Sequence, residues 1–274
     1  MSGWEIYFTK FDHGTYGYKD KKVVKLPDNL PMPPTTNISD MFADCHELQD
    51  ISALANWDIS KVTKMWRMFR GCEQLKDITA LSNWDTGNVT CMYETFRKCQ
   101  QLEDISALAR WDVSKAENID GMFSFCEQLK DISALAKWNV SKVKNMRSMF
   151  WDCEQLKDIT ALAKWDVGNV TNMHGVFSGC IQLQDVSALS EWNTSKVTDI
   201  HNMFDGCFRI KDLSALANWD ISKVTKTNMF SDSLLITLSS MQSYIRKTSS
   251  TADKERIKEL ESRLSELEER LKPS

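Results

Sequence analysis

One phrase returns along this chain at a fixed interval, and it constrains the fold more than any other feature. CEQLKDISALAKW at residues 126–138 reappears as CEQLKDITALAKW at residues 153–165, and CEQLKDITALSNW stands earlier, at residues 72–84. Cysteine marks seven copies, at Cys45, Cys72, Cys99, Cys126, Cys153, Cys180 and Cys207. A bulky residue that returns at such a period stacks on its own copy, since each unit of a repeat protein buries its apolar face against its neighbours.

Three further apolar residue types keep the same register. Tryptophan runs from Trp57 to Trp219, phenylalanine from Phe42 to Phe204, and leucine from Leu54 to Leu216, each in steps of 27. We therefore predict an α/β repeat solenoid of the leucine-rich-repeat type, with about seven 27-residue coils that contain short strands and short helices. A C-terminal helix resembling a coiled coil completes the predicted fold.

Each coil divides into three parts. In KVTKMWRMFRGCEQL, Val62, Met65, Met68, Phe69 and Cys72 stand at steps of three and four, which predicts a short helix. Between Leu75 and Ile78 the apolar–x–x–apolar pattern fits a strand that is too short to establish from periodicity. The segment DISALANW at residues 50–57 spaces its apolar residues by threes, as a 3₁₀-like turn does.

The ends of the chain depart from the repeat and suggest domain boundaries. Residues 1–34 are expected to form an N-terminal cap, because they combine an alternating strand-like segment with a degenerate coil. The solenoid is expected at 35–230, followed by a C-terminal cap and linker at 231–252 and a short coiled-coil helix at 253–274.

Composition and charge exclude several classes of function. The net charge of −4 gives no broad attraction to nucleic acid. No apolar run in the sequence is long enough to span a membrane. The opening MSGWEIYFTKFDHG lacks the basic and continuous apolar regions of a secretory signal. We expect an intracellular, cytoplasmic location, while surface or particle association without a cleaved signal stays open.

Neither the cysteines nor the aspartates predict a metal site. The cysteines form no C-x-x-C pairs, so we expect a ladder of buried, reduced thiols rather than zinc or a disulfide framework. An aspartate recurs before each ISAL segment, from Asp50 to Asp212 in steps of 27. We expect each to accept hydrogen bonds from nearby backbone amides, with calcium binding as the alternative. No cofactor is expected.

The repeat resembles the BspA-like leucine-rich repeats, also described as the mycoplasma-type lipoprotein surface repeat. The similarity rests on NVTNMHGVFSGC at residues 169–180 and on the W-D-x-S-K-V-T pattern at 57–63 and 219–225. DISALANW also resembles the turn segment of internalin-type repeats. The resemblance implies a curved solenoid whose surface binds other macromolecules, in a group found in bacteria, protists and large DNA viruses and often placed on surfaces or in contact with a host.

Comparing the coils with one another shows where the repeat tolerates change. Candidate partner-binding residues stand at the variable positions of the predicted helices: Trp66, Arg67, Arg70, Tyr93, Arg97, Phe125, Arg147, Trp151, His174 and His201. Trp, Tyr and Arg most often dominate binding energy at protein interfaces. The alternative is free drift of a surface whose stray aromatics pack on neighbouring coils. The two histidines stand one repeat apart and lack a third metal ligand.

The C-terminal segment follows a different period. Five apolar residues alternate steps of three and four as coiled-coil core positions do: Ile257, Leu260, Leu264, Leu267 and Leu271. In a parallel pair Arg256 faces Glu261 and Arg263 faces Glu268, whereas an antiparallel pair sets Arg against Arg. The charges predict a parallel homodimer or homotrimer; a single helix docked on the C-terminal cap is the alternative.

No arrangement of the four histidines with a nucleophile suggests catalysis, so no catalytic residue is assigned. We expect a non-enzymatic scaffold that binds an unidentified host or cellular protein and self-associates through its C-terminal helix. The alternatives are a structural component of an envelope, particle or matrix, and an adhesin-like host-contact protein. A carbohydrate site at Trp66 and Tyr93 is a further alternative.

Overall fold

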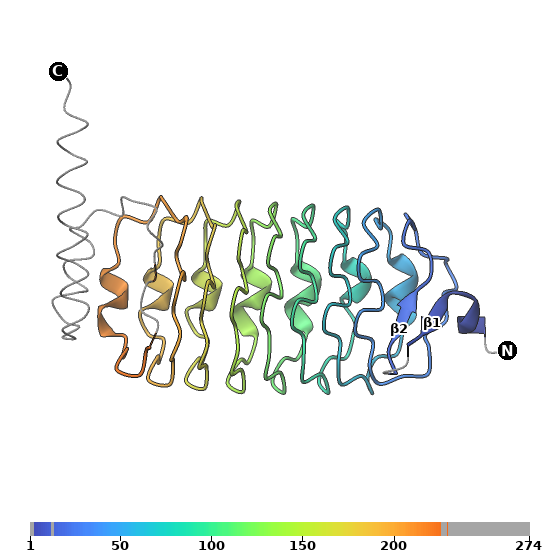
Figure 1. The fold of residues 1–274 in the computed structure, drawn as a ribbon, viewed down its shortest axis with the longest axis horizontal. Coiled ribbons are helices and arrows are strands. Elements are labelled where there is room, and N and C mark those ends of the chain that lie inside the picture. Colours follow the sequence, from blue (N-terminus) through green and yellow to red (C-terminus); the bar gives the residue numbers. More distant parts are fainter. Residues whose placement is uncertain (1–2, 12–13, 226–228, 230–274) are drawn as a thin grey trace, which may run out of the picture.

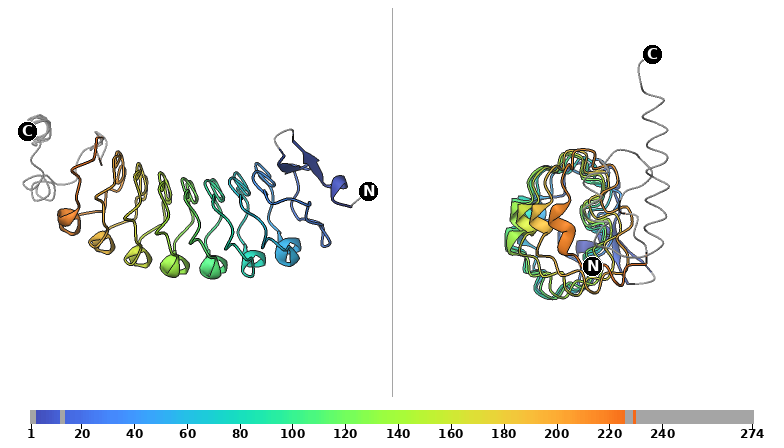
Figure 2. Two further views of the ribbon diagram at one scale, coloured as in Figure 1. Left: turned by 90° about the horizontal axis from the view of Figure 1, so that it is seen from below. Right: turned by 90° about the vertical axis from the view of Figure 1, so that its left-hand side faces the viewer.

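The computed structural model describes residues 3–11, 14–225 and 229. These residues wind into successive coils that lie side by side, with the N-terminal segment at one end of the row (Figure 1). The row bends into an arc (Figure 2). The predicted boundaries at 231–252 and 253–274 lie outside the described residues.

A short 3₁₀ helix occupies the same place in every coil. The chain begins with η1 (Gly3–Ile6), β1 (Phe8–Lys10) and β2 (Tyr16–Tyr18). The repeated helices are η2 (Ser52–Asn56), η3 (Thr79–Leu81), η4 (Ser106–Arg110), η5 (Ser133–Lys137), η6 (Thr160–Leu162), η7 (Ser187–Leu189) and η8 (Ser214–Asn218). They lie on the outer, convex side of the arc (Figure 2). The predicted 3₁₀-like turns are confirmed.

The short helix predicted over Val62–Cys72 is wrong, and the described residues contain no α-helix. The amides of Met65, Arg67, Phe69 and Gly71 donate instead to carbonyls of the next coil, at 2.7–3.1 Å. Arg67 has a φ of 53° and Gly71 one of 74°, and the corresponding residues of later coils are also left-handed. The three-residue spacing of the buried side chains comes from local turns, such as the one closed by the hydrogen bond from the Cys72 amide to the Phe69 carbonyl.

The strand between Leu75 and Ile78 is also absent. Within the described segments, strand-like pairing between coils in this part of the repeat is limited to isolated parallel bridges such as Asp104 with Asp131. A longer series of bridges joins Asn37, Lys64, Cys91, Asn118, Asn145, Asn172 and Asp199. An apolar–x–x–apolar pattern over so short a stretch does not distinguish a strand from a turn, because either structure can bury the two apolar residues.

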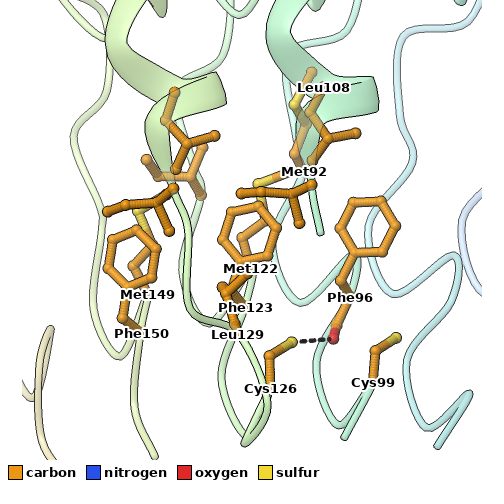
Figure 3. Close-up of a cluster of buried hydrophobic side chains, with 14 of the residues drawn as sticks. Met92, Phe96, Cys99, Leu108, Met122, Phe123, Cys126, Leu129, Met149 and Phe150 are labelled. Atoms are coloured by element: carbon orange, nitrogen blue, oxygen red, sulfur yellow. Dashed lines mark hydrogen bonds between the residues drawn. The ribbon is translucent and has the colours of Figure 1, made fainter. Parts of the chain in front are cut away.

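The core consists of stacked copies of single residues. Phe42, Phe69, Phe96, Phe123, Phe150, Phe177 and Phe204 are fully buried, with successive ring centroids 5.6–5.8 Å apart and ring planes within 9° of parallel. Figure 3 shows three of these rings side by side among buried methionines, leucines and cysteines. Like side chains stack because each coil presents the same shape to its neighbour at native packing density.

Each ladder tryptophan joins neighbouring coils by a hydrogen bond from its indole nitrogen as well as by its buried apolar surface. The indole N–H of Trp138 donates to the carbonyl of Leu108 at 3.1 Å, and the equivalent bond to a leucine of the preceding coil recurs from Trp84 to Trp219. The same carbonyl also accepts a hydrogen bond from a backbone amide of its own coil, as Leu108 does from Trp111 at 3.0 Å. The indole therefore adds a second hydrogen bond to this carbonyl and links the two coils, a bond worth about 0.5–1.5 kcal/mol.

The predicted burial of the cysteine ladder is confirmed. All eight cysteines are free, and the seven of the repeat are buried. The thiol of Cys126 donates to the carbonyl of Phe96 at 3.2 Å (Figure 3), as do its equivalents. Burial raises the pKa of Cys45 to about 11 and that of Cys207 to about 12, so these thiols stay protonated.

The aspartates before ISAL cap the 3₁₀ helices, as predicted. Asp131 accepts a hydrogen bond from the amide of Ser133 at 2.7 Å, and every aspartate of the series makes the equivalent bond. Hydrogen bonds from Ser52 hold the pKa of Asp50 below its usual value, and those from Thr160 do the same for Asp158. The described residues hold no group of three metal-ligating side chains.

The N-terminal segment covers the first coil. β1 pairs antiparallel with β2, with Phe8 opposite Tyr18, and the Tyr18 amide donates to the carbonyl of Met41. Phe8 packs its ring against Phe42 and Trp57. The open face of the first coil is thereby closed by aromatic side chains rather than by another copy of the repeat.

Candidate interaction surface

The segment 64–71 begins half a coil beyond η2 and therefore lies on the opposite, inner side of the arc (Figure 2). Two rows of side chains occupy this side of the later coils, and we call them together the inner face. One row is Trp66, Tyr93, Asp120, Arg147, His174 and His201; the other is Arg70, Arg97, Ser124, Trp151, Ser178 and Asp205. Their buried neighbours, such as Met65 and Phe69, point into the core.

All ten sequence-predicted binding residues belong to these rows or stand beside them. Arg67 and Phe125 are the two that flank the rows, at left-handed positions with φ of 53° and 60°. Arg147 is exposed, and the other nine are partly buried. The structure groups the predicted residues at two places along the inner face.

The first group is an aromatic pair covered by a cation. The rings of Trp66 and Tyr93 stack 5.3 Å apart and within 4° of parallel. The guanidinium carbon of Arg67 lies 4.5 Å from the Trp66 centroid and 5.7 Å from that of Tyr93. Both distances fall within the range of a cation–π contact. Because each ring turns one face to the other, a sugar could stack only on the remaining faces.

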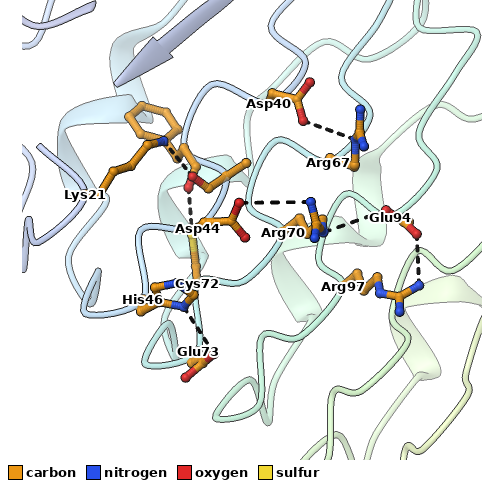
Figure 4. Close-up of polar contacts among 12 residues, drawn as sticks. Lys21, Asp40, Asp44, His46, Arg67, Arg70, Cys72, Glu73, Glu94 and Arg97 are labelled. Carbon is orange, nitrogen blue, oxygen red and sulfur yellow. Dashed lines mark hydrogen bonds and ion pairs between the residues drawn. The ribbon is translucent and has the colours of Figure 1, made fainter. Parts of the chain in front are cut away.

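A chain of ion pairs involves the arginines of the same coils, as Figure 4 shows. Arg67 Nε lies 3.1 Å from Asp40, and Arg97 lies 2.9 Å from Glu94. Arg70 stands between Asp44 and Glu94, 4.0 Å from each. The distances show that Arg70 has looser contacts than Arg67 or Arg97.

The acidic members of these ion pairs are not among the predicted binding residues. Asp40 and Asp44 belong to the first coil and Glu94 to the third, so each stands one coil away from an arginine of the second. The sequence did contain a signal for these ion pairs. Asp40 and Glu94 each stand one repeat from Arg67, and residues one repeat apart are neighbours along the stack. The predicted binding residues were chosen because aromatic and basic side chains dominate binding energy at interfaces, and this criterion does not select acidic residues.

The second group joins an indole to two imidazoles. The Trp151 ring lies 6.0 Å from that of His174, which stacks 5.5 Å from His201. Gly175, with a φ of +60°, makes room for the indole, since a Cβ there would lie 2.7 Å from the Trp151 ring. His174 Nδ1 is 3.9 Å from Asp199.

Between the groups the inner face becomes more polar. Burial raises the pKa of Asp120, and Arg147 in the next coil partly opposes that rise. Burial likewise raises the pKa of Tyr93. Trp66, Tyr93 and Trp151 are partly buried, since each contacts a ring of the adjacent coil and keeps only part of its area for a partner.

Comparison with models of protein families assigns this chain to one family. The family model described as "Mycoplasma protein of unknown function, DUF285" matches residues 36–161 and 126–244. The two matches together cover most of the chain, so the protein belongs to this family. No curated protein matches it.

A distant likeness is found among the solved structures. A leucine rich cell surface protein from Faecalibacterium prausnitzii is 14% identical, with 89% of this chain and 96% of that chain covered. The TM-score is 0.22, which does not establish a common fold. In the described part of the chain, no helix has the length and apolar character needed to cross a membrane.

Proposed function

We propose that this protein is a non-enzymatic interaction scaffold, a leucine-rich-repeat-type solenoid of the BspA-like kind, that binds another protein through its inner face. The observation that carries the proposal is the concentration of Trp66, Tyr93 and three arginines on two adjacent coils of an otherwise uniform repeat. Partly buried aromatics and arginines in fixed positions are typical of residues that dominate binding energy.

The same group explains how a partner would be held. Arg67, itself paired with Asp40, lies over the rings of Trp66 and Tyr93 and holds them in place before binding, so little side-chain freedom is lost on contact. Arg70 is the more loosely paired cation, and it is the one best placed to turn toward a carboxylate of a partner. The Trp151–His174–His201 group would extend the contact along the arc.

Quantitative affinity capture from host and cell lysates tests this proposal. Trp66→Ala/Tyr93→Ala/Trp151→Ala forms the test variant, and Arg110→Ala/Lys137→Ala/Lys164→Ala, at exposed positions in or beside the 3₁₀ helices, is the matched control. Circular dichroism and thermal unfolding establish that both are folded. We expect a captured protein to be lost by at least roughly tenfold in the test variant and retained by the control.

Equal capture by all three proteins, or no capture by any, would contradict the proposal and would assign the aromatics to packing between coils. Cross-linking followed by mass spectrometry identifies the contact directly. Links between a captured protein and Lys98, which neighbours Arg97, are expected, whereas links confined to Lys137 or Lys164 would place the binding surface on the outer side.

Self-association through residues 253–274 is the second part of the proposal. Its support is the pattern of Ile257, Leu260, Leu264, Leu267 and Leu271 with charges that favour parallel pairing. Two or more inner faces on one assembly would raise the overall affinity for a multivalent partner without any new contact. The oligomeric state of a Leu264→Lys variant tests this part separately.

A structural role, in which copies of the chain pack against one another, is the second candidate function. It is favoured by the placement of the exposed large apolar side chains. Within the described residues these are Ile6, Phe11, Val24 and Phe208, and they belong to the two ends of the row of coils.

A further inference from the structure

The last two described coils carry an apolar pair at a position that is polar elsewhere. This position is occupied by His46, Glu73, Gln100, Glu127 and Glu154 in the first five coils, and by Ile181 and Phe208 in the last two. Phe208 is 63% exposed. Phenylalanine is among the residues most often buried, so this exposure is unusual. We call Ile181 and Phe208 the end patch.

In the earlier coils the polar residues at this position contact one another along the stack. His46 Nδ1 lies 3.1 Å from Glu73, and Gln100 donates to Glu127 at 2.7 Å. Apolar residues cannot replace these bonds. The change from polar to apolar therefore removes a contact between coils and leaves hydrophobic area in water.

The backbone changes at the same place. In the earlier coils an amide one residue further on donates to the preceding coil, for example from Gln128 to the carbonyl of Gln100 at 3.2 Å. In the last two coils the amides of Ile181 and Phe208 donate locally, to Gly179 and Gly206, at 2.8 and 2.9 Å. Side chain and backbone thus depart together from the pattern of the repeat.

The end patch lies close to the point where the chain leaves the described coils. Phe204, in the same coil as Phe208, donates its amide to the carbonyl of Met229 at 2.9 Å. Residues 230–274 follow, and they include the predicted parallel pairing segment. In a parallel pair both chains enter the paired segment at the same end, which brings the last coils of the two copies to the same end of the assembly.

We propose that the end patch is a self-association surface that meets the end patch of a second copy of this chain. The proposal rests on the self-association described under the proposed function. A second copy is favoured as the occupant because the paired segment spans only slightly more than two heptads, so its association is weak without a contact between the coils. A two-fold contact sets the same residues of both copies against each other, and an apolar pair is complementary to itself.

The arrangement also explains the polar residues earlier in the chain. An apolar side chain at this position in all seven coils would form a continuous exposed stripe and would allow copies to slide past one another. Restricting it to Ile181 and Phe208 gives one register, and the charged and amide side chains from Glu73 to Glu154 disfavour the others.

Sedimentation velocity of the full chain over a range of concentrations tests the proposal. The variant Phe208→Gln/Ile181→Gln restores the residue type found at Gln100, and Ile6→Gln, at 70% exposure, is the matched control at the other end. We expect the double variant to weaken self-association about tenfold, a typical effect for a buried interface aromatic, and the control to leave it unchanged. Leu264→Lys is expected to abolish it.

The outcomes separate this inference from the proposed function. Loss of association in Leu264→Lys with no effect of Phe208→Gln/Ile181→Gln would keep the paired segment and overturn the end patch. A wild type that stays monomeric at every concentration would overturn both. Weakening by both Ile6→Gln and the double variant, with assemblies that grow without limit, would replace the two-fold contact by a head-to-tail one and also overturn the proposal.

Thiol cross-linking provides a second, geometric test. Cys91→Asn, which introduces the residue found at Asn118, removes the partly buried cysteine, and Phe208→Cys then places a thiol in the end patch. A short bismaleimide is expected to yield covalent dimers of this variant. Glu154→Cys in the same background is the control, and equal cross-linking of both variants would contradict a contact centred on Phe208.

Discussion

The two sides of each coil have diverged to different degrees. On the outer side the segment that contains the capping aspartate, the ladder leucine and the tryptophan is nearly the same in all seven copies. On the inner face the first row changes from tryptophan through aspartate and arginine to histidine. The outer segment supplies buried rings and caps that every coil needs, whereas the side chains of the inner rows, the buried Ser124 and Ser178 excepted, are at least partly exposed and differ between coils.

Thiol reactivity gives the largest expected contrast between the core and the inner side. Cys126 is fully buried with a pKa raised by burial, while Cys91 is partly exposed beside the inner face, with a smaller burial-induced rise of its pKa. At mildly alkaline pH we expect one thiol per chain to react with iodoacetamide, and the other seven to react about a thousandfold more slowly, because they require opening of the coils. Peptide mapping by mass spectrometry identifies the reactive site.

The variant Cys91→Asn should lose the fast reaction and keep the slow one. Fast labelling of several repeat cysteines in the native protein would show that the thiol ladder is open to solvent, and the distinction between core and inner side would fail there.

Two tryptophans, one in the core and one on the inner face, test the same contrast in stability. Trp138→Ala removes a buried ring and the hydrogen bond to Leu108. It should lower the free energy of unfolding by about 3–5 kcal/mol. Trp151→Ala, on the inner face, should cost about 1 kcal/mol or less. Urea unfolding followed by circular dichroism measures both.

Trp138→Phe refines the comparison, because it keeps an aromatic ring but removes the indole donor and the second ring. The Leu108 carbonyl keeps its hydrogen bond from the Trp111 amide, so we expect a loss of about 1–3 kcal/mol from one hydrogen bond and the small cavity that the smaller ring leaves. Equal costs for Trp138→Ala and Trp151→Ala would mean that the inner-face indole is structural rather than available for binding.

The capping aspartates predict the acid limit of stability. Hydrogen bonds lower the pKa of Asp50 and of Asp158 in the folded protein, so the folded state favours their ionised forms. This contribution is present above the unfolded pKa of about 3.9 and is lost as the pH falls through the lower folded values. The midpoint of thermal unfolding should therefore fall on acidification from about pH 5 to about pH 3.

Asp158→Asn keeps an acceptor oxygen, as Asn139 does when it accepts from the Ser141 amide. We expect this variant to lose little stability at neutral pH and to show a shallower decline in acid than the wild type. An identical decline would assign the acid sensitivity to other carboxylates.

The ion pairs of the inner face should have the smallest effect on stability. Arg97→Ala removes a contact with Glu94 between two partly exposed side chains. It should change the free energy of unfolding by less than about 1 kcal/mol. The same variant should weaken capture of a partner. A large loss of stability without any change in capture would reverse the roles that we assign to the core and to the inner face.

Much of the core could be predicted because the evidence for it is repeated. Phe96, Trp111 and Cys99 each have a copy one coil away, and the spacing alone shows that the copies stack. The caps at Asp131 and its equivalents could be predicted because an Asp-x-Ser bond is local in the chain. The predicted helix at Val62–Cys72 was wrong because spacing by three and four describes which residues are buried, not where the backbone amides donate.

The sequence by itself determined the 27-residue period, the composition of the core, the 3₁₀ turns and the capping aspartates, since these depend on local bonds or on identical neighbours. Only the tertiary structure decided that Met65, Arg67, Phe69 and Gly71 donate to the next coil, and that Trp66 lies against Tyr93 beneath Arg67. The physical reason is that hydrogen bonds and ring contacts between coils depend on how far and in which direction one coil is displaced from the next. That displacement is set by the packing of the whole stack, and no single coil's sequence specifies it.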